Sequence, residues 1–408
     1  MRNLSVDFRS VAGLSGLILL AGPQAALAQK KMEPITELRF DLGATAESNI
    51  ARSSALLAQQ RGLERDDFVV TPTVNLNLAR QLGRAEVMVN GQLGYSFHAK
   101  NTELNRERIG VNVSAELPLS ICRISPTFGI QRRQSDLRDV VFVPNVGVEN
   151  AKNAETTQRY GITVGCGRSP GLQPFVGVDY ERADNSNPLR ERAEYDATTL
   201  RGGLRYASPA LGEVSIYGSQ RSVDLSPVGA PVGTDNSYRF EQISADFRRD
   251  IGTRITTKAS LGYGKISSNN ALVSGFSGVV WNVDVSALIG ASMRLAVGTG
   301  REVGNSQSSD ASFVVTKPHR VRLEYAFSDR AHFDGGLLYT QKRFGYRGAQ
   351  PVLAITNEER QLYDAGLALD VGRNLTVRVY GGHERRNANG TFFDYRASFA
   401  GASLSLRI

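Results

Sequence analysis

The sequence predicts an all-β protein, a transmembrane antiparallel up-and-down β-barrel of about eighteen strands, with about sixteen as the alternative. Three observations predict this fold. The chain begins with a secretory signal. Segments of about twelve to fifteen residues then alternate apolar and polar side chains. The turns between these segments are alternately short and long, and no later segment has the roughly 18 consecutive apolar residues of a membrane helix.

The first 28 residues have the three parts of a signal peptide. Two arginines give a positive start, residues 11–21 form a short apolar run, and Ala26-Leu27-Ala28 is a small-x-small cleavage site. We therefore expect cleavage after Ala28 and export to the outer membrane of a Gram-negative bacterium. Residues 29–408 are predicted to form a single barrel domain.

The alternation is plain in many segments. Within 108–117, Ile109, Val111 and Val113 face one side, and Arg108, Asn112 and Glu116 face the other. The predicted strands lie near 35–48, 67–80, 85–99, 106–118, 121–135, 154–168, 172–183, 194–207, 212–223, 238–249, 253–267, 277–289, 292–303, 316–327, 331–344, 359–371, 374–386 and 392–408. Most of these are longer than the strands of soluble proteins, and closure into a barrel would leave no sheet edge unpaired.

Aromatic residues recur near the strand ends and predict interfacial girdles, although aromatic β-propensity is the alternative. They are Tyr95, Phe97, Tyr160, Tyr206, Tyr263, Tyr325, Phe327, Tyr363, Phe392 and Phe393. The final strand alternates through Leu404, Leu406 and Ile408, as expected of a signal for the barrel-assembly machinery. Its alternation changes phase near Gly401, which predicts a bulge.

Short turns, such as 80–84, are expected on the periplasmic side, and longer loops, such as 50–66, on the outside. The loop 136–153 is the most apolar of the long loops. Two arrangements are open for it: a packed outer cap, which we favour slightly, or a constriction folded into the pore. No other loop is recognisable as a dedicated constriction.

The chain has two cysteines, Cys122 and Cys166. Exported proteins meet an oxidising compartment, so an even number of cysteines favours a disulfide. The predicted strands place both residues near the periplasmic end of neighbouring strands, on the apolar-facing side. The alternative is a pair of buried thiols.

The inward-facing positions carry many charges and lean basic. The cations are predicted to line the lumen and contact solute or polymer at Arg108, Arg123, Arg133, Arg159, Arg201, Arg205, Arg221, Arg254, Lys258, Arg294, Arg320, Arg322 and Arg378. Without the signal peptide the net charge falls from +8 to +7, since two arginines and one aspartate are removed. The charges would favour anionic solutes, or they would pair with lumenal acids and only keep the lumen wet.

No motif indicates catalysis or a cofactor. The four histidines lack a recognisable nucleophile or metal-ligand spacing, and the glycine-rich stretch 298–304 has neither the spacing nor the following helix of a phosphate loop. We expect no enzyme activity, no metal, no cofactor and no nucleic-acid partner.

The stretch DDFVVTPTVNLNLARQLGRAEVMVNGQLGYSFHAKNTELNRERIGV (66–111), the repeated hairpins and the terminal LSLRI resemble the β-barrel porin 2 family. The resemblance implies a partner of exopolysaccharide secretion. We therefore expect an outer-membrane conduit for an acidic exopolysaccharide; the alternative is a general diffusion porin for small, preferentially anionic solutes. Expected partners are outer-membrane lipid and lipopolysaccharide, and a periplasmic polysaccharide-export protein.

Overall fold

The computed structural model describes residues 34–139, 152–168, 170–226, 236–270, 273–306, 311–346, 355–389 and 393–408. The predicted signal peptide lies outside the described residues. The strands are β1 Ile35–Glu47, β2 Asp67–Leu82, β3 Ala85–His98, β4 Arg106–Leu119, β5 Cys122–Gln134, β6 Ala154–Cys166, β7 Gly171–Asn185, β8 Tyr195–Ser208, β9 Gly212–Leu225, β10 Ser237–Ile251, β11 Ile255–Ser267, β12 Phe276–Ile289, β13 Met293–Asn305, β14 Ala311–Ala326, β15 Ala331–Tyr346, β16 Asn357–Val371, β17 Leu375–Ala388 and β18 Tyr395–Arg407.

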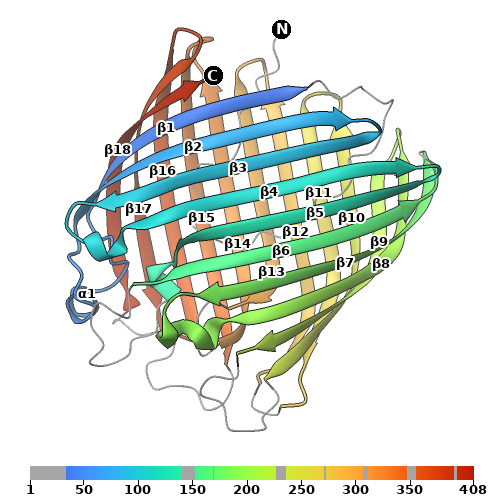
Figure 1. The fold of residues 1–408 in the computed structure, drawn as a ribbon, viewed down its shortest axis with the longest axis horizontal. Coiled ribbons are helices and arrows are strands. Elements are labelled where there is room, and N and C mark those ends of the chain that lie inside the picture. The colour runs from blue at the N-terminus through green and yellow to red at the C-terminus, as the bar shows by residue number, and fades with distance from the viewer. Residues whose placement is uncertain are drawn as a thin grey trace.

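These strands form one closed antiparallel barrel (Figure 1). Each strand pairs with its neighbours in sequence, and β18 returns to pair with β1 from Arg39↔Arg407 to Glu47↔Phe399. The last residue completes the closure, because the Ile408 amide donates to the Leu38 carbonyl over 2.8 Å. The predicted eighteen strands are therefore confirmed, and closure leaves no edge with unpaired backbone groups.

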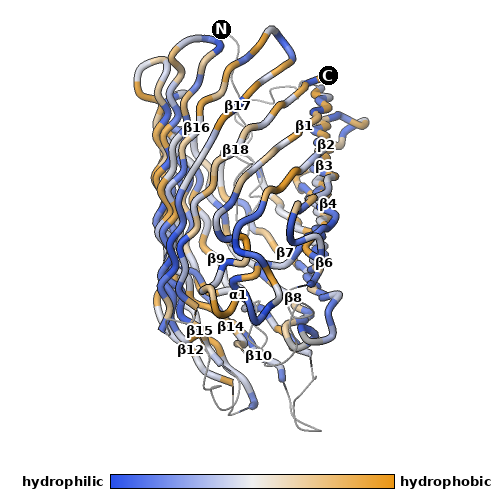
Figure 2. Tube along the Cα trace, turned by 90° about the vertical axis from the view of Figure 1, so that its left-hand side faces the viewer, coloured by the Kyte–Doolittle hydropathy of each residue, from blue (hydrophilic) through white to orange (hydrophobic). Residues whose placement is uncertain are grey.

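The outer surface of the barrel is apolar. On four consecutive strands, Leu200, Ile216, Ile243 and Leu261 are between 55% and 69% exposed. Along each strand hydrophobic and hydrophilic positions alternate (Figure 2). Water would penalise so large an apolar surface, whereas lipid accepts it. The fold is therefore a transmembrane barrel of the outer-membrane type.

Eight of the ten predicted girdle aromatics lie exposed on the outer surface, namely Tyr95, Phe97, Tyr160, Tyr206, Tyr263, Tyr325, Phe327 and Tyr363. Phe393 is instead buried beneath a loop, and Phe392 lies outside the described residues. Tyr95, Phe97, Tyr206, Tyr263 and Tyr325 lie within four residues of a strand end, where an amphipathic ring can reach the lipid headgroups. Tyr160 and Tyr363 lie six residues from the nearer end of their strands.

The bulge predicted at Gly401 is wrong. The pairing of β18 with both β1 and β17 runs through Gly401 without a register shift. Phe399 is an inward-facing residue on the same face as Gly401 and Ser403. The apparent change of phase in the sequence therefore comes from one aromatic side chain that faces the lumen.

The structure joins Cys122 and Cys166 in a disulfide. Cys122 opens β5 and Cys166 closes β6, and the two are direct cross-strand partners. Both lie on the lipid-facing side, with Ile124 and Val164 as their neighbours on that face. The disulfide thus fastens the open end of the β5–β6 hairpin, opposite the long loop that joins the strands.

The helical segments of the described residues lie at the long-loop end. The helix α1 (Ala55–Gln60) lies between β1 and β2, and short 3-10 turns occur at Thr102–Leu104, Leu137–Asp139 and Pro188–Ala193. Among the described residues, no helix is long and apolar enough to cross a membrane. The strand β1 begins and the strand β18 ends at the end of the barrel away from α1 (Figure 1), so the short turns mark the periplasmic side and the long loops the outside.

Candidate channel lumen and mouth

The barrel wall turns a polar face inward. Eight of the predicted lumen cations form ion pairs with inward acids one or two strands away: Arg123–Glu116, Arg159–Glu181, Arg201–Asp179, Arg205–Glu213, Arg221–Glu181, Arg320–Asp284, Arg322–Asp334 with Asp364, and Arg378–Asp334. The sequence left two alternatives for these cations: to attract anionic solutes or to pair with lumenal acids. Most of them are paired with acids. A guanidinium has five N–H donors, and one carboxylate uses at most two or three of them. Donors thus remain for a passing solute.

Several of these arginines lie flat against the wall over a glycine. A Cβ built on Gly177 would come within 2.9 Å of Arg201 Nε, and one on Gly366 within 2.7 Å of Arg378 Nη2. Any larger residue at either glycine would push the guanidinium into the pore. Inward glycines therefore keep the lumen wide while they hold the charge at its wall.

Some lumen cations have no acidic partner. Within the described residues, no carboxylate lies within 4 Å of Arg108, Lys258 or Arg294. The Arg108 side chain projects from the inner face of β4 and is exposed, which indicates water-filled space beside it.

Arg133 lies opposite Glu155 in the register of β5 and β6. Arg254, predicted to lie on a strand, lies instead in the turn before β11.

The first long loop folds over the mouth of the barrel. In the β1–β2 loop, Ala51, Ala58 and Leu63 are buried against Leu104 of the β3–β4 loop and Leu137 of the β5–β6 loop. The loop is also tied to the wall, because Asn49 donates to the Arg396 carbonyl over 3.2 Å. A dedicated inward loop, which the sequence did not reveal, is therefore present.

One carboxylate holds this arrangement together. Glu384 faces inward from β17 and accepts from Arg52 (3.1 Å), Arg138 (3.0 Å), Arg360 (3.0 Å) and the Tyr395 hydroxyl. Arg52 belongs to the β1–β2 loop and Arg138 to the β5–β6 loop, whereas Arg360 and Tyr395 belong to the wall. We call Arg52, Asp136, Arg138, Arg360 and Glu384 the mouth ion cluster.

The mouth ion cluster reaches across the barrel. Arg138 follows β5 and Glu384 lies on β17, with β18, β1, β2, β3 and β4 between them in the barrel order. Residues 136–139, the first part of the predicted 136–153 loop, therefore extend over the lumen. Residues 140–151 lie outside the part of the chain that the structure describes. The two folded loops narrow the passage beneath them.

Asp136 supports Arg138 from the same loop. Burial tends to raise the pKa of Asp136, but the adjacent Arg138 guanidinium outweighs it and holds that pKa far below the ordinary carboxyl value. Because the pKa is lower in the folded loop than in a detached one, ionised Asp136 stabilises the folded loop above about pH 4. This stabilisation is lost as the pH falls below that value.

We therefore expect acid to loosen the mouth. Single-channel conductance of the refolded barrel should rise as the pH falls below about 4, because Asp136 then begins to take up a proton in the detached loop. The Asp136→Asn variant should show the higher conductance already at pH 7 and a weaker response to acid. An acid response unchanged by this substitution would contradict the assignment.

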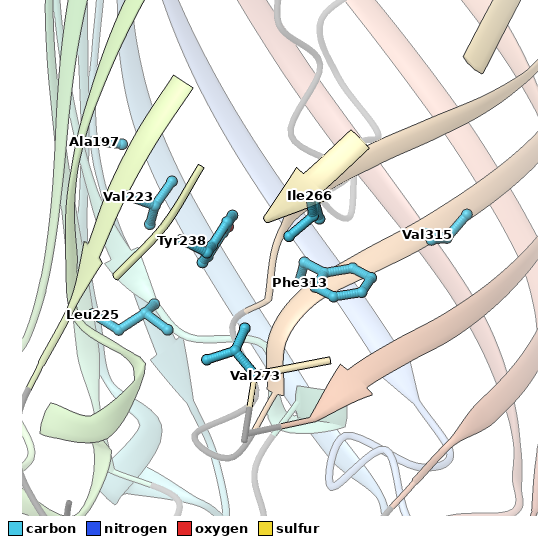
Figure 3. Close-up of a cluster of buried hydrophobic side chains, with 8 residues drawn as sticks. All are labelled: Ala197, Val223, Leu225, Tyr238, Ile266, Val273, Phe313 and Val315. Atoms are coloured by element: carbon cyan, nitrogen blue, oxygen red, sulfur yellow. The ribbon is translucent and has the colours of Figure 1, made fainter. Parts of the chain in front are cut away.

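A second part of the mouth is fixed by apolar contacts. Eight buried side chains from β8–β14 and the β11–β12 loop meet there: Ala197, Val223, Leu225, Tyr238, Ile266, Val273, Phe313 and Val315 (Figure 3). The Tyr238 hydroxyl donates to Asn305 Oδ1 over 2.7 Å, and the Ser274 amide donates to the Tyr346 carbonyl over 3.0 Å. Because these contacts are apolar or neutral, we expect charge and pH to act on the ion pairs of the mouth and not on this apolar part.

The histidines do not form a catalytic arrangement. Each contacts one polar side chain, in the pairs His98–Asp67 (3.2 Å), His319–Thr299 (2.8 Å), His332–Asp370 (3.4 Å) and His383–Ser398 (2.9 Å). The pairs His319–Thr299 and His383–Ser398 each join a base to a hydroxyl, but the described residues place no third group that hydrogen-bonds and orients either imidazole. No three His, Cys, Asp or Glu side chains of the described segments are grouped to hold a metal ion.

The solved structures that resemble this barrel include outer-membrane porins and siderophore receptors of Pseudomonas. One is OccK2 (OpdF) of Pseudomonas aeruginosa in complex with glucuronate, with a TM-score of 0.49 and 10% identity, covering 92% of this chain and 98% of that one. A BenF-like porin from Pseudomonas fluorescens Pf-5 has a TM-score of 0.49 and 13% identity, with 92% and 99% covered. P. aeruginosa OpdK with vanillate has a TM-score of 0.44 and 14% identity, with 91% and 99% covered.

No protein-family model matches the chain, and no curated protein matches it either. The resemblance to the β-barrel porin 2 family therefore stays a prediction. With TM-scores below 0.5 and identities of 14% or less, the solved structures carry no information on what passes through this barrel.

Proposed function

We propose that this protein is a diffusion channel of the outer membrane for small solutes, with a preference for anions. The carrying observation is a lumen whose wall presents paired arginines and the exposed, unpaired Arg108, beneath a mouth narrowed by two inward loops. Small hydrated solutes fit a narrowed, charged passage, and rings of fixed charge set ion preference in pores.

Export of an acidic exopolysaccharide has less support. A polymer needs a continuous path through the mouth, whereas the mouth ion cluster holds two loops over it by buried charge-assisted hydrogen bonds. The paired lumen arginines also leave fewer free cations for an acidic polymer than their number in the sequence predicted.

The test is the ion preference of the refolded barrel in a planar bilayer. Under a salt gradient the reversal potential should indicate a preference for chloride over potassium. Removing an unpaired lumenal charge with Arg108→Ala should lower this preference by about a factor of two, since fixed charge near the path sets it. The outward-facing Arg182, exposed and paired with Asp184, offers a matched control, and Arg182→Ala should leave the reversal potential unchanged.

Two outcomes would contradict the proposal. One is a barrel with no ion conductance in the wild type and in variants with a disrupted mouth. The other is loss of surface polysaccharide from a strain lacking the gene, restored by complementation, which would support export instead.

A further inference from the structure

Two arginines lie side by side on the outer surface at the loop end of the barrel. Arg385 on β17 and Arg396 on β18 are direct cross-strand partners, and both are exposed. Like charges directly opposite each other in a sheet are destabilising. The described residues place no carboxylate within 4 Å of either guanidinium, and Arg385 Nε donates only to Asn387 Oδ1 over 3.1 Å.

Two outward arginines on the β4–β7 side of this end are paired with acids. Arg132 on β5 bonds Glu107 over 2.5 Å and Thr156 over 2.8 Å. Arg182 on β7 bonds both oxygens of Asp184, over 2.9 Å and 3.1 Å. On the β4–β7 side of the barrel, acids of the protein therefore balance the charges of Arg132 and Arg182. No acid of the described residues does so for Arg385 and Arg396, so an external anion can bind them.

The surroundings of the pair indicate where that anion lies. One step closer to the membrane centre, on the same outward face, His383 bonds Ser398 and lies opposite the girdle residue Tyr363. Two residues along a strand span about 7 Å, so Arg385 and Arg396 lie just beyond the aromatic girdle. This is the depth of lipid headgroups in the outer leaflet. Exposed Lys317 and Arg343, on β14 and β15, widen the cationic surface at the same end.

We propose that Arg385 and Arg396 form a binding site for a phosphate group of lipid A, on the outer wall of the barrel. A planar guanidinium binds phosphate through two parallel N–H donors, and two adjacent guanidinium groups can share the oxygens of one phosphate. The bound phosphate would remove the repulsion between the arginines and fix this side of the barrel in the lipopolysaccharide leaflet.

The experiment measures binding of bisphosphorylated and dephosphorylated lipid A to the refolded barrel in neutral detergent by native mass spectrometry. The wild type should prefer the phosphorylated form. In the Arg385→Ala, Arg396→Ala double variant its affinity should fall by about tenfold or more, given about fivefold per surface cation. The Arg132→Ala, Arg182→Ala double variant is the matched control and should stay within about twofold of the wild type.

Both double variants alter exposed side chains, and heat-dependent electrophoretic mobility verifies that each barrel is folded. Three results would overturn the proposal: equal binding of the two lipid forms, equal losses in the two double variants, or full displacement of lipid A by millimolar inorganic phosphate. The last would assign the pair to free phosphate rather than to lipid. None of these results bears on conductance, so the proposed channel function is tested separately.

Discussion

Replacing Glu384 with glutamine is expected to release the loops from the mouth of the barrel. The carboxylate is 3% exposed and accepts from three arginines and one tyrosine. Glutamine keeps the volume but removes the charge. Arg360 then has no carboxylate partner among the described residues, whereas Arg52 keeps Glu47 and Arg138 keeps Asp136. Breaking a buried ion pair costs about 3–5 kcal/mol where the remaining charge is uncompensated. The remaining partners of Arg52 and Arg138 reduce that cost, so we expect the detached arrangement of the loops to gain population.

Two measurements check this expectation. Single-channel conductance should rise and its open-state noise should increase, because the β1–β2 loop no longer narrows the passage. Trypsin should cut the same loop faster at Arg52 and Arg61, which the folded loop buries or half-buries. The barrel itself should keep its folded mobility, since strand pairing is not altered.

The control for Glu384 lies on the neighbouring strand. Glu359 on β16 is exposed on the outer surface, accepts from Gln341 over 3.1 Å and has no contact with the mouth ion cluster among the described residues. Glu359→Gln should change neither conductance nor proteolysis. If Glu384→Gln behaves as this control does, the mouth ion cluster does not hold the loops.

Removing the disulfide should lower the stability of the barrel without preventing its formation. Cys122 and Cys166 are 44 residues apart in sequence. In the chain-entropy model, opening a closed loop of this length costs about 4 kcal/mol of unfolding free energy, within a usual range of about 0–5. The hairpin between them retains its cross-strand hydrogen bonds, so the native topology should still form.

The measurement is urea unfolding of the refolded Cys122→Ser, Cys166→Ser variant in lipid vesicles, followed by tryptophan fluorescence of Trp281. The midpoint should shift to lower urea, and the reduced wild type should shift by the same amount. A reduced wild type that unfolds like the oxidised protein would contradict a stabilising role for the disulfide. Trp281 lies on β12, away from the hairpin, and so reports the barrel as a whole.

Local alternation of apolar and polar residues in the sequence was sufficient to predict the strands that form the wall of the barrel. Side chains on a strand point to opposite faces in turn, so segments such as 108–117 identify both the strand and its two faces. No knowledge of tertiary contacts is needed to predict the strands. Every strand of the barrel has lipid on its outer face and water on its inner face, so every strand shows the same alternation. The even strand number, the positions of the turns and the neighbouring cysteines follow from the same periodicity.

The predictions failed where one residue departs from the periodicity. Phe399 faces the lumen although it is apolar, so the alternation near Gly401 resembled a bulge. Arg254 falls on the inward parity but lies in a turn. The helix α1 is six residues long, which is too short for a helical period. Its one local signal is Ser54, whose side chain accepts from the Leu57 amide over 3.3 Å as an N-cap.

By itself, the sequence determined the barrel of about eighteen strands, its lipid-facing surface and the charged inner wall, because each depends on the two-residue period of a strand. Only the tertiary structure decided which lumen arginines are paired, and that Arg52 and Arg138 meet Glu384 across the mouth. Those contacts join residues up to 332 positions apart. They depend on closure of the barrel, which brings distant loops over one opening, and no local pattern records that proximity.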